Sequence, residues 1–253
     1  LVVCNLYPFS EIIKKQESDL AMAMENVDIG GPTMIRSAAK NVGWVCVLVD
    51  HGDYNNFIDK LNSDKISYET RKKLSVKAFG HTAQYDTIIH NHLIDETLPD
   101  SLSFTYTKHS ILRYGENPHQ TAAAYRITND KSINILNAKI HQGKALSYNN
   151  IMDADAALSC LKELDKTACV VVKHSNPCGV AVGENMLDVY KNAFSADSLS
   201  AFGGIIAINK KCTEEIANEI NKVFVEIVIA PSFDARALEV FSNKKNLRIL
   251  EIG

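Results

Sequence analysis

Short, continuous apolar runs alternate along the chain with longer amphipathic stretches. Six of these runs have the length of strands that are covered on both faces of a sheet. They occupy residues 1–4, 44–49, 168–172, 204–208, 225–230 and 247–252. A polar–apolar alternation at residues 104–107 predicts a further, half-buried strand.

Apolar positions at helical spacing predict helices between these strands. The predicted helices cover residues 10–26, 32–40, 53–61, 67–93, 150–164, 186–196, 213–223 and 234–241. Pro32 stands in a first turn, where proline is tolerated, while Asn150 and Thr213 have the side chains of N-caps. The alternation of strand and helix predicts an α/β fold.

Composition and charge narrow the function classes. The chain has 253 residues, of which 46% are hydrophobic and 23% charged, with a net charge of -3. This acidic balance argues against a general nucleic-acid binder, and no apolar run reaches the roughly 20 residues that span a bilayer. The six cysteines form no close Cys-x-x-Cys pair, which predicts reduced thiols and a cytoplasmic protein.

The chain is long enough for two domains. The polar segment 96–103, which contains Pro99, is the predicted linker between a domain at residues 1–95 and another at residues 104–253. Because the chain starts at Leu1 and stops at Gly253 beside predicted core strands, we expect it to be a fragment of a longer protein.

Polar residues that directly follow strands are the candidate site residues, because ligands of open α/β sheets bind outside the carboxyl ends of the strands. Four segments qualify, at residues 5–7, 28–40, 173–179 and 200–204.

Residues 28–33 join free backbone N–H groups to a helix N-terminus, which suits an anion or a developing oxyanion. Arg36 and Lys40 follow on one face of that helix. Their charges predict a negative partner, either a carboxylate such as Asp28 or a bound phosphate. A solvated basic helix face explains the same spacing equally well.

Residues 173–179 are the densest chemical cluster. The charge of Lys173 favours a neutral imidazole in His174, which would be a base usable near neutral pH. Pro177 biases Asn176 to extended backbone, which predicts a loop held open above the sheet. A turn with a satisfied histidine remains an alternative, and so does a nucleophilic Cys178 beside His174, although a cysteine there more often packs.

The sequence predicts no metal site. A zinc deaminase needs a glutamate where Asn176 stands and a second cysteine where Ala181 stands. His90 and His92 lack the spacing and companions of metal ligands. The glycine pairs complete neither a P-loop nor a dinucleotide-binding fingerprint.

Taken together, six motifs resemble the family of bifunctional purine-biosynthesis enzymes that combine AICAR transformylase with IMP cyclohydrolase. They are residues 4–9 (CNLYPF), 28–31 (DIGG), 36–41 (RSAAKN), 77–86 (KAFGHTAQYD), 112–120 (LRYGENPHQ) and 173–179 (KHSNPCG). The match runs over essentially the whole chain and crosses the predicted linker.

The resemblance implies a methylglyoxal-synthase-like partial domain at residues 1–95, the rear portion of the cyclohydrolase. Residues 104–253 would be the front portion of the transformylase, whose fold is related to cytidine deaminases without their zinc. The implied reactions are formyl transfer from the cosubstrate 10-formyltetrahydrofolate to AICAR, which gives FAICAR, and dehydrative closure of FAICAR to IMP. The family implies a cytoplasmic homodimer with no metal in the chemistry and no nucleic-acid or membrane partner.

For the cyclohydrolase, the matching positions imply nucleotide contacts, assistance at the reacting carboxamide and formyl groups, and a proton donor or acceptor. Cys4, Asn5 and Ile29 would contact the nucleotide. Tyr7 and Asp28 would assist at the reacting groups, and Lys40 would be the proton donor or acceptor. A phenol, a carboxylate and an ammonium suit a ring closure that moves two protons.

For the transformylase, the resemblance implies that Arg113 and Tyr114 hold AICAR, that Gly203 lets the backbone approach the substrate, and that Glu226 contacts the nucleotide. His174 would take the proton of the attacking amine. Lys173 would stabilise the oxyanion and shape the basicity of His174.

Both ends of the family's two-domain pattern are missing, so we expect this chain alone to be inactive in both reactions. One competing hypothesis is a noncatalytic nucleotide-binding module that uses Arg36, Lys40 and Arg113 only as phosphate ligands. Another is a single-activity enzyme such as a methylglyoxal-synthase-like lyase, with the second part as scaffold.

Overall fold

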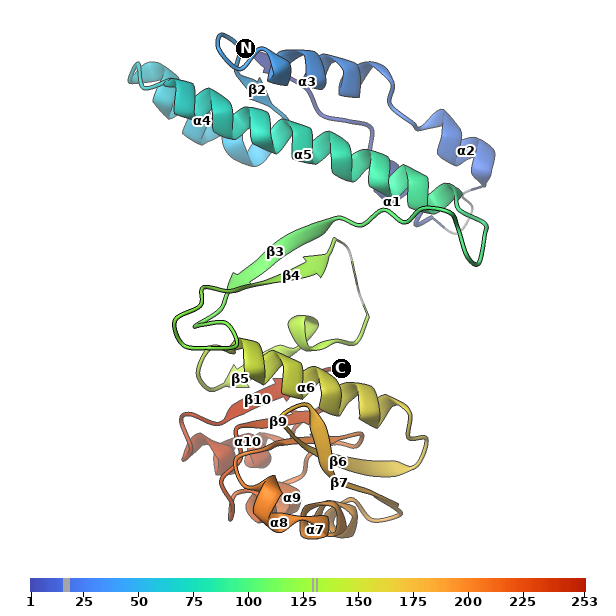
Figure 1. Cartoon of the computed structure of the whole chain (residues 1–253), viewed down its shortest axis with the longest axis vertical. Coiled ribbons are helices and arrows are strands. Elements are labelled where there is room, and N and C mark those ends of the chain that lie inside the picture. Colours follow the sequence, from blue (N-terminus) through green and yellow to red (C-terminus); the bar gives the residue numbers. More distant parts are fainter. Residues whose placement is uncertain (16–18, 129, 131) are drawn as a thin grey trace. The chain divides into compact units, whose positions relative to one another are not determined.

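The computed structural model of the chain describes residues 1–15, 19–128, 130 and 132–253. Its contacts divide the chain into two compact units, Leu1–Thr105 and Tyr106–Gly253. Helices and strands occur in both units (Figure 1), which confirms the mixed α/β class. None of the helices in the described residues has the length and apolar composition needed to cross a membrane.

The first unit is a short parallel strand pair packed against helices. The strands are β1 (Val2–Val3) and β2 (Val47–Leu48), and the helices are α1 (Phe9–Ile12), α2 (Leu20–Glu25), α3 (Gly30–Lys40), α4 (Tyr54–Asn62) and α5 (Tyr68–Leu93), with a 3-10 turn at His51–Asp53. Its largest core cluster joins α3 and α5 to β2 through Ile35, Ala78 and Val47.

Three predictions for this unit are corrected. Val3 is 50% exposed, so β1 is not covered on both faces. The strand predicted at 44–49 is confined to β2: the N–H groups of Trp44 and Val45 donate to the carbonyl of Asn41 in a turn, and Trp44 is 89% exposed. The helix predicted at 10–26 is divided: α1 ends at Ile12, and the side chain of Asp19 starts α2 by accepting a hydrogen bond from the backbone of Met22. Residues 16–18 of that prediction lie outside the described residues.

The second unit contains a six-stranded sheet and a separate antiparallel pair, β3 (Tyr106–Ile111) with β4 (Ala123–Ile127). The sheet strands are β5 (Lys139–Gln142), β6 (Thr167–Lys173), β7 (Asn176–Gly183), β8 (Ile205–Ile208), β9 (Ile227–Ala230) and β10 (Arg248–Glu251). The helices are α6 (Tyr148–Lys162), α7 (Met186–Ala196), α8 (Ser198–Ala201), α9 (Glu214–Ile220) and α10 (Ala235–Ser242), with a 3-10 turn at Ile135–Asn137.

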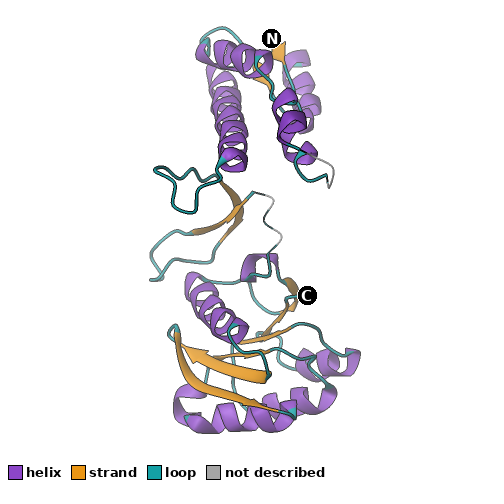
Figure 2. Ribbon diagram, turned by 90° about the vertical axis from the view of Figure 1, so that its right-hand side faces the viewer, coloured by secondary structure: helices purple, strands orange, loops and turns teal. Residues whose placement is uncertain are grey.

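Helices cover both faces of this sheet, as Figure 2 shows. Val170 packs into the layer of α6, whereas its neighbour Val171 packs into the layer of α7, α9 and α10. This two-sided burial explains why β8, β9 and the interiors of β6 and β10 are apolar without alternation.

The strand order is β5-β10-β9-β8-β6-β7. The strands β8, β9 and β10 run parallel to one another, whereas β6 runs antiparallel to β8 and to β7. The edge strand β7 was not predicted from the sequence. It follows β6 so closely that residues 173–179 form a hairpin and not the predicted open loop.

The start of α6 also differs from its prediction. Ser147 is the N-cap: its hydroxyl accepts a hydrogen bond from the backbone N–H of Asn150, while the side chain of Asn150 accepts one from the backbone of Ser147. Asn150 is therefore the N3 residue of a capping box. Its side-chain oxygen binds the start of the helix, so its side-chain NH₂ can bind a partner outside the helix.

Candidate active site

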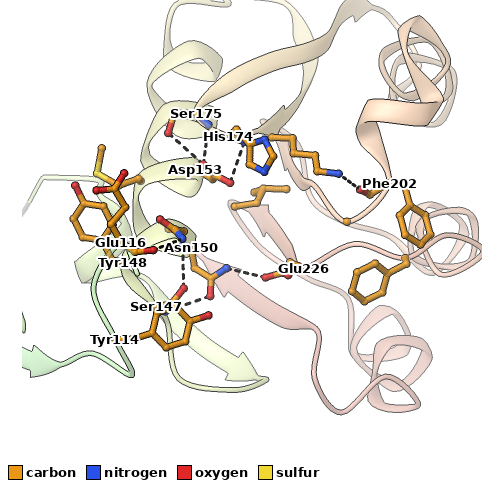
Figure 3. A pocket seen from close by; sticks show the side chains of 16 residues that line it. Tyr114, Glu116, Ser147, Tyr148, Asn150, Asp153, His174, Ser175, Phe202 and Glu226 are labelled. Atoms are coloured by element: carbon orange, nitrogen blue, oxygen red, sulfur yellow. Dashed lines mark hydrogen bonds between the residues drawn. The ribbon is translucent and has the colours of Figure 1, made fainter. Parts of the chain in front are cut away.

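A cavity of about 710 Å³ opens at one end of the six-stranded sheet (Figure 3). Its size lies within the range of roughly 300–1,000 Å³ that is usual for small-molecule sites. The start of α6, the β6–β7 turn and the segments before β8 and β9 supply most of its wall. The lining residues are Tyr114, Glu116, Ser147, Tyr148, Asn149, Asn150, Met152, Asp153, Lys173, His174, Ser175, Phe202, Gly203, Ile205, Phe224 and Glu226.

The strand directions correct the prediction that the site residues directly follow strands. Lys173 is indeed the last residue of β6. Gly203 and Glu226, however, stand just before the amino ends of β8 and β9. Because β6 runs against its neighbour β8, the end of one and the start of the other meet at the same edge of the sheet.

His174 and Ser175 are the two central residues of the β6–β7 turn, since Lys173 and Asn176 are paired across the hairpin. Both have left-handed backbone, with φ of 55° and 58°. This conformation costs a residue other than glycine about 1–2 kcal/mol. The turn exposes the imidazole of His174 at the wall of the cavity.

Lys173 lies between the sheet and the open cavity. Its Nζ donates a hydrogen bond of 2.8 Å to the backbone carbonyl of Phe202, the residue before Gly203. The ammonium is thereby held across the cavity edge from β6 towards the start of β8. Its predicted effect on the basicity of His174 stays a prediction.

Glu226 is held by a polar network at the other side of the cavity. One of its carboxylate oxygens accepts a hydrogen bond of 2.8 Å from Nδ2 of Asn150 and lies 3.4 Å from Nη1 of Arg248. The Arg248 guanidinium also donates to the carbonyls of Lys144 and Ala145. Burial lowers the pKa of Arg248, an effect that the carboxylate of Glu226 opposes.

Gly203 has φ of 74°, which favours glycine, and its N–H donates to the carbonyl of Phe224. The rings of Phe202 and Phe224 lie beside it, with their centroids 5.4 Å apart. Two aromatic faces and a residue without a side chain therefore form one part of the wall, an arrangement suited to a planar ring.

Tyr114 lines the cavity, and the guanidinium of Arg113 lies 5.5 Å from the centre of its ring. This is a cation–π distance. The structure therefore brings together five of the predicted transformylase residues, Tyr114, Lys173, His174, Gly203 and Glu226, with Arg113 adjacent to them.

Cys178 does not have the surroundings of a nucleophile. Its thiol donates to the carbonyl of Val171 at 3.5 Å, and the side chain packs against the core beneath the sheet. Burial raises the pKa of Cys178. It therefore behaves as a packing residue, and the alternative of a Cys178–His174 pair loses support.

The first unit gathers most of the predicted cyclohydrolase residues at the start of α3. Oδ1 of Asp28 accepts a hydrogen bond of 2.7 Å from the N–H of Gly31, and Oδ2 accepts one of 3.3 Å from the N–H of Tyr7. The thiol of Cys4 approaches the carbonyl of Gly31 at 3.9 Å, and the next residue, Asn5, donates to the hydroxyl of Tyr54. Ile29 stands exposed beside this cluster.

Lys40 and Arg36 are not brought to that cluster. Lys40 is the last residue of α3, so about 14 Å of helix separates its backbone from that of Gly31. The guanidinium of Arg36 lies over the ring of Phe79 at 5.5 Å. The predicted ion pair with Asp28 is not among the ion pairs of the described residues, because that carboxylate accepts backbone N–H groups instead.

Two residues of the cavity region were missed by sequence reasoning. Asp153 binds the backbone of the β6–β7 turn, and Arg248 binds Glu226. Asp153 follows Asn150 by three residues and therefore shares its helix face, a signal that was readable. Within residues 1–15, 19–128, 130 and 132–253, no group of three His, Cys, Asp or Glu side chains is placed to hold a metal ion.

Comparison with known proteins gives the family. The profile of the AICARFT/IMPCHase bienzyme family matches residues 38–253. The chain is 51% identical over 256 residues to the "Bifunctional purine biosynthesis protein PurH" of Bacillus cereus (strain B4264), and 47% identical over 252 residues to the protein of that name from Leuconostoc mesenteroides. Each alignment covers 100% of this chain and 50% of the relative, so the chain spans about half the length of the curated relatives it matches. The chain belongs to the AICARFT/IMPCHase bienzyme family.

Proposed function

We propose that the chain is a working part of a bifunctional purine-biosynthesis enzyme. In the first reaction a formyl group passes from 10-formyltetrahydrofolate to the amine of AICAR, and in the second the product FAICAR closes to IMP. The observation that carries this proposal is the placement of Lys173, His174 and Glu226 around one cavity. The relatives' name, a bifunctional purine biosynthesis protein, supports the same pathway.

Formyl transfer needs a base, because the aromatic amine of AICAR is a weak nucleophile. The imidazole of His174 accepts a proton from this nitrogen as the nitrogen bonds to the formyl carbon. The bond between that carbon and N10 of the folate breaks, and the proton passes to N10. The ammonium of Lys173, which is within the same wall, offsets the negative charge that develops on the formyl oxygen.

The remaining cavity residues suit the nucleotide. Oε2 of Glu226 is occupied by Asn150 and Arg248, which leaves Oε1 to accept a hydrogen bond from a substrate hydroxyl. Arg113 supplies a positive charge beside Tyr114 for the phosphate. The pair Phe202 and Phe224 offers its rings to a planar heterocycle of either substrate.

For ring closure, we assign nucleotide contacts to Cys4, Asn5 and Ile29, and assistance at the reacting groups to Tyr7 and Asp28. The cluster around Asp28 supports these assignments. Lys40 remains the proposed proton donor or acceptor, although its backbone is at the other end of α3.

The wider organisation follows the same proposal. Residues 1–95 would be the methylglyoxal-synthase-like rear portion of the cyclohydrolase, residues 96–103 the linker, and residues 104–253 the cytidine-deaminase-like front portion of the transformylase. The whole enzyme would act as a cytoplasmic homodimer, with the formyl-transfer sites shared between subunits.

The test is an assay of the full-length enzyme that contains this chain, with AICAR and 10-formyltetrahydrofolate. We expect His174→Ala to stop formyl transfer and Lys40→Ala to let FAICAR accumulate. The 253-residue chain alone is expected to show no turnover. If neither substitution changes either step, the residues are structural and a noncatalytic nucleotide-binding module becomes the better account.

A further inference from the structure

The turn that presents His174 is held in a conformation that its own residues do not favour. Two-residue hairpin turns with both central residues in the left-handed region prefer glycine at the second position. This turn has Ser175 there, with φ of 58°. An interaction from outside the hairpin therefore has to offset the unfavourable backbone.

Asp153 supplies that interaction from α6. Its Oδ1 accepts hydrogen bonds from the N–H of Ser175 at 2.7 Å and from the Ser175 hydroxyl at 3.2 Å, and its Oδ2 accepts one from the N–H of His174 at 3.3 Å. Figure 3 shows the carboxylate facing both turn residues. Successive backbone N–H groups of a turn form a concavity suited to an anion, and here the anion is a side chain of the same protein.

The helix that carries this carboxylate is packed against the sheet. The next residue, Ala154, is fully buried in the core between α6 and the sheet, as is Ala157 one turn later. The helix begins at the Ser147 capping box. The opposite side of the turn is closed by Asn176, whose Nδ2 donates to the carbonyl of His174 at 2.8 Å.

We propose that Asp153 is a positioning residue for formyl transfer. It fixes the main chain of His174 against α6 and so keeps the imidazole directed into the cavity, at the place where the amine proton has to be accepted. This inference rests on the proposed function of His174. Asp153 acts through His174 and needs no contact with the reacting atoms.

The experiment compares kcat and KM for AICAR in the full-length enzyme for Asp153→Ala, Asp153→Asn and the double variant Asp153→Ala/Ser175→Gly. The matched control is Asp155→Ala, which removes an exposed carboxylate from the same helix. We expect Asp153→Ala to lower kcat on the order of 100-fold, since small misplacements of a reacting group have effects of this size. KM should change little, because Glu226 and Tyr114 lie on other elements.

Glycine at position 175 adopts the left-handed backbone without a partner, so the double variant should recover part of the lost kcat. Asparagine keeps one acceptor oxygen at position 153 and should show an intermediate loss. If Asp153→Ala does not fold, Asp153→Asn replaces it in the comparison. The kcat of Asp153→Asn should likewise rise when Ser175→Gly is added. A merely structural role would lower the yield or the Tm without this pattern in kcat.

The outcomes separate the two proposals. If His174→Ala stops formyl transfer while Asp153→Ala matches Asp155→Ala in kcat, the positioning role is wrong and the proposed function stands. If His174→Ala leaves formyl transfer intact, the proposed role of His174 is wrong, and the positioning role of Asp153 is wrong with it. A loss of kcat in Asp153→Ala that Ser175→Gly does not relieve would also overturn the positioning role, because it would place the effect outside the turn.

Discussion

Arg248 and Glu226 form an ion pair, 3.4 Å long, in which the two side chains have different surroundings. The arginine side chain is 6% exposed, whereas the glutamate side chain is 41% exposed and lines the cavity. The guanidinium is also held by the carbonyls of Lys144 and Ala145. Arg248 therefore anchors Glu226 from within the protein and leaves the cavity side of its carboxylate open.

Replacing Arg248 with methionine should destabilise the second unit. The substitution removes a donor from each of two carbonyls and the charged partner from the Glu226 carboxylate, which keeps its hydrogen bond from Asn150. We expect this to cost about 2–3 kcal/mol in the free energy of unfolding. Urea unfolding of the 253-residue chain measures this change in the free energy of unfolding. Arg236→Met is the control, because its pair with Glu214 is exposed on both sides, and it should change stability by less than about 1 kcal/mol. Equal losses in the two variants would contradict the anchoring role.

Cys178→Ala should keep formyl-transfer activity in the full-length enzyme. The thiol donates to the carbonyl of Val171, and burial raises its pKa, so it is not the thiolate that nucleophilic catalysis needs. Burial also raises the pKa of Cys212 to about 12, and that thiol should stay unlabelled by a thiol reagent in the folded protein. A kcat as low as that of His174→Ala would restore Cys178 as a candidate nucleophile.

Acid should weaken the edge of the sheet at β5 and β10. The hydrogen bond from His141, at 2.9 Å, is the largest cause that lowers the pKa of Glu251 below its ordinary 4.5. A lowered pKa in the folded state contributes stability that is present above the ordinary value and is lost as the pH falls through the folded pKa. Wild type should therefore exceed Glu251→Gln in stability at neutral pH, with the difference shrinking below about pH 4.5.

Unfolding measured at several pH values tests this. Glu239→Gln, an exposed carboxylate on α10, is the control and should follow the wild-type profile. A stability difference for Glu251→Gln that stays constant down to pH 3 would show that the pair does not titrate with folding.

Gly179→Ala should be strongly destabilising, because a Cβ there would overlap the backbone carbonyl of Ala193 in α7. Neither backbone can yield without separating β7 from its helix. We expect a loss of about 3 kcal/mol or more, as for overpacked cores. Gly80→Ala in α5 is the matched control, because an added Cβ there would have no neighbouring atom within 4 Å. Alanine also stabilises a helix relative to glycine by about 0.5–1 kcal/mol. Thermal unfolding should show a lower Tm for Gly179→Ala and a higher Tm for Gly80→Ala than for the wild type.

Much of the second unit could be predicted because burial on both faces leaves continuous apolar runs. The strands β8, β9 and β10 lie within the predicted runs, β6 extends one residue beyond its run at each end, and Thr213 caps α9 as expected. By contrast, β7 was missed, since Pro177, Gly179 and Gly183 are turn signals that an edge strand tolerates. Apolar runs also carry no information on strand direction, so the mixed ends that form the cavity could not be predicted.

The candidate site divides in the same way. His174 and Lys173 were identified because several reactive side chains stand together after a strand. Asp153 and Arg248 are charged residues in elements that bury apolar side chains on another face, and a charge in such a pattern suggests a solvent-facing position. Only the three-dimensional pairing of Arg248 with Glu226, 22 residues earlier, reveals its role.

The position of β5 in the sheet has a consequence for the order of folding. The hairpin of β6 and β7 closes over two residues and can form early, whereas β5 pairs with β10, which follows it by about 100 residues: Gln142 lies opposite Ile249. During synthesis β5 is the first of the six strands to emerge, and its neighbour β10 is the last. We therefore expect the sheet to be completed last at this edge, so that the ribosome has to release the segment carrying Arg248 before Glu226 gains its anchor.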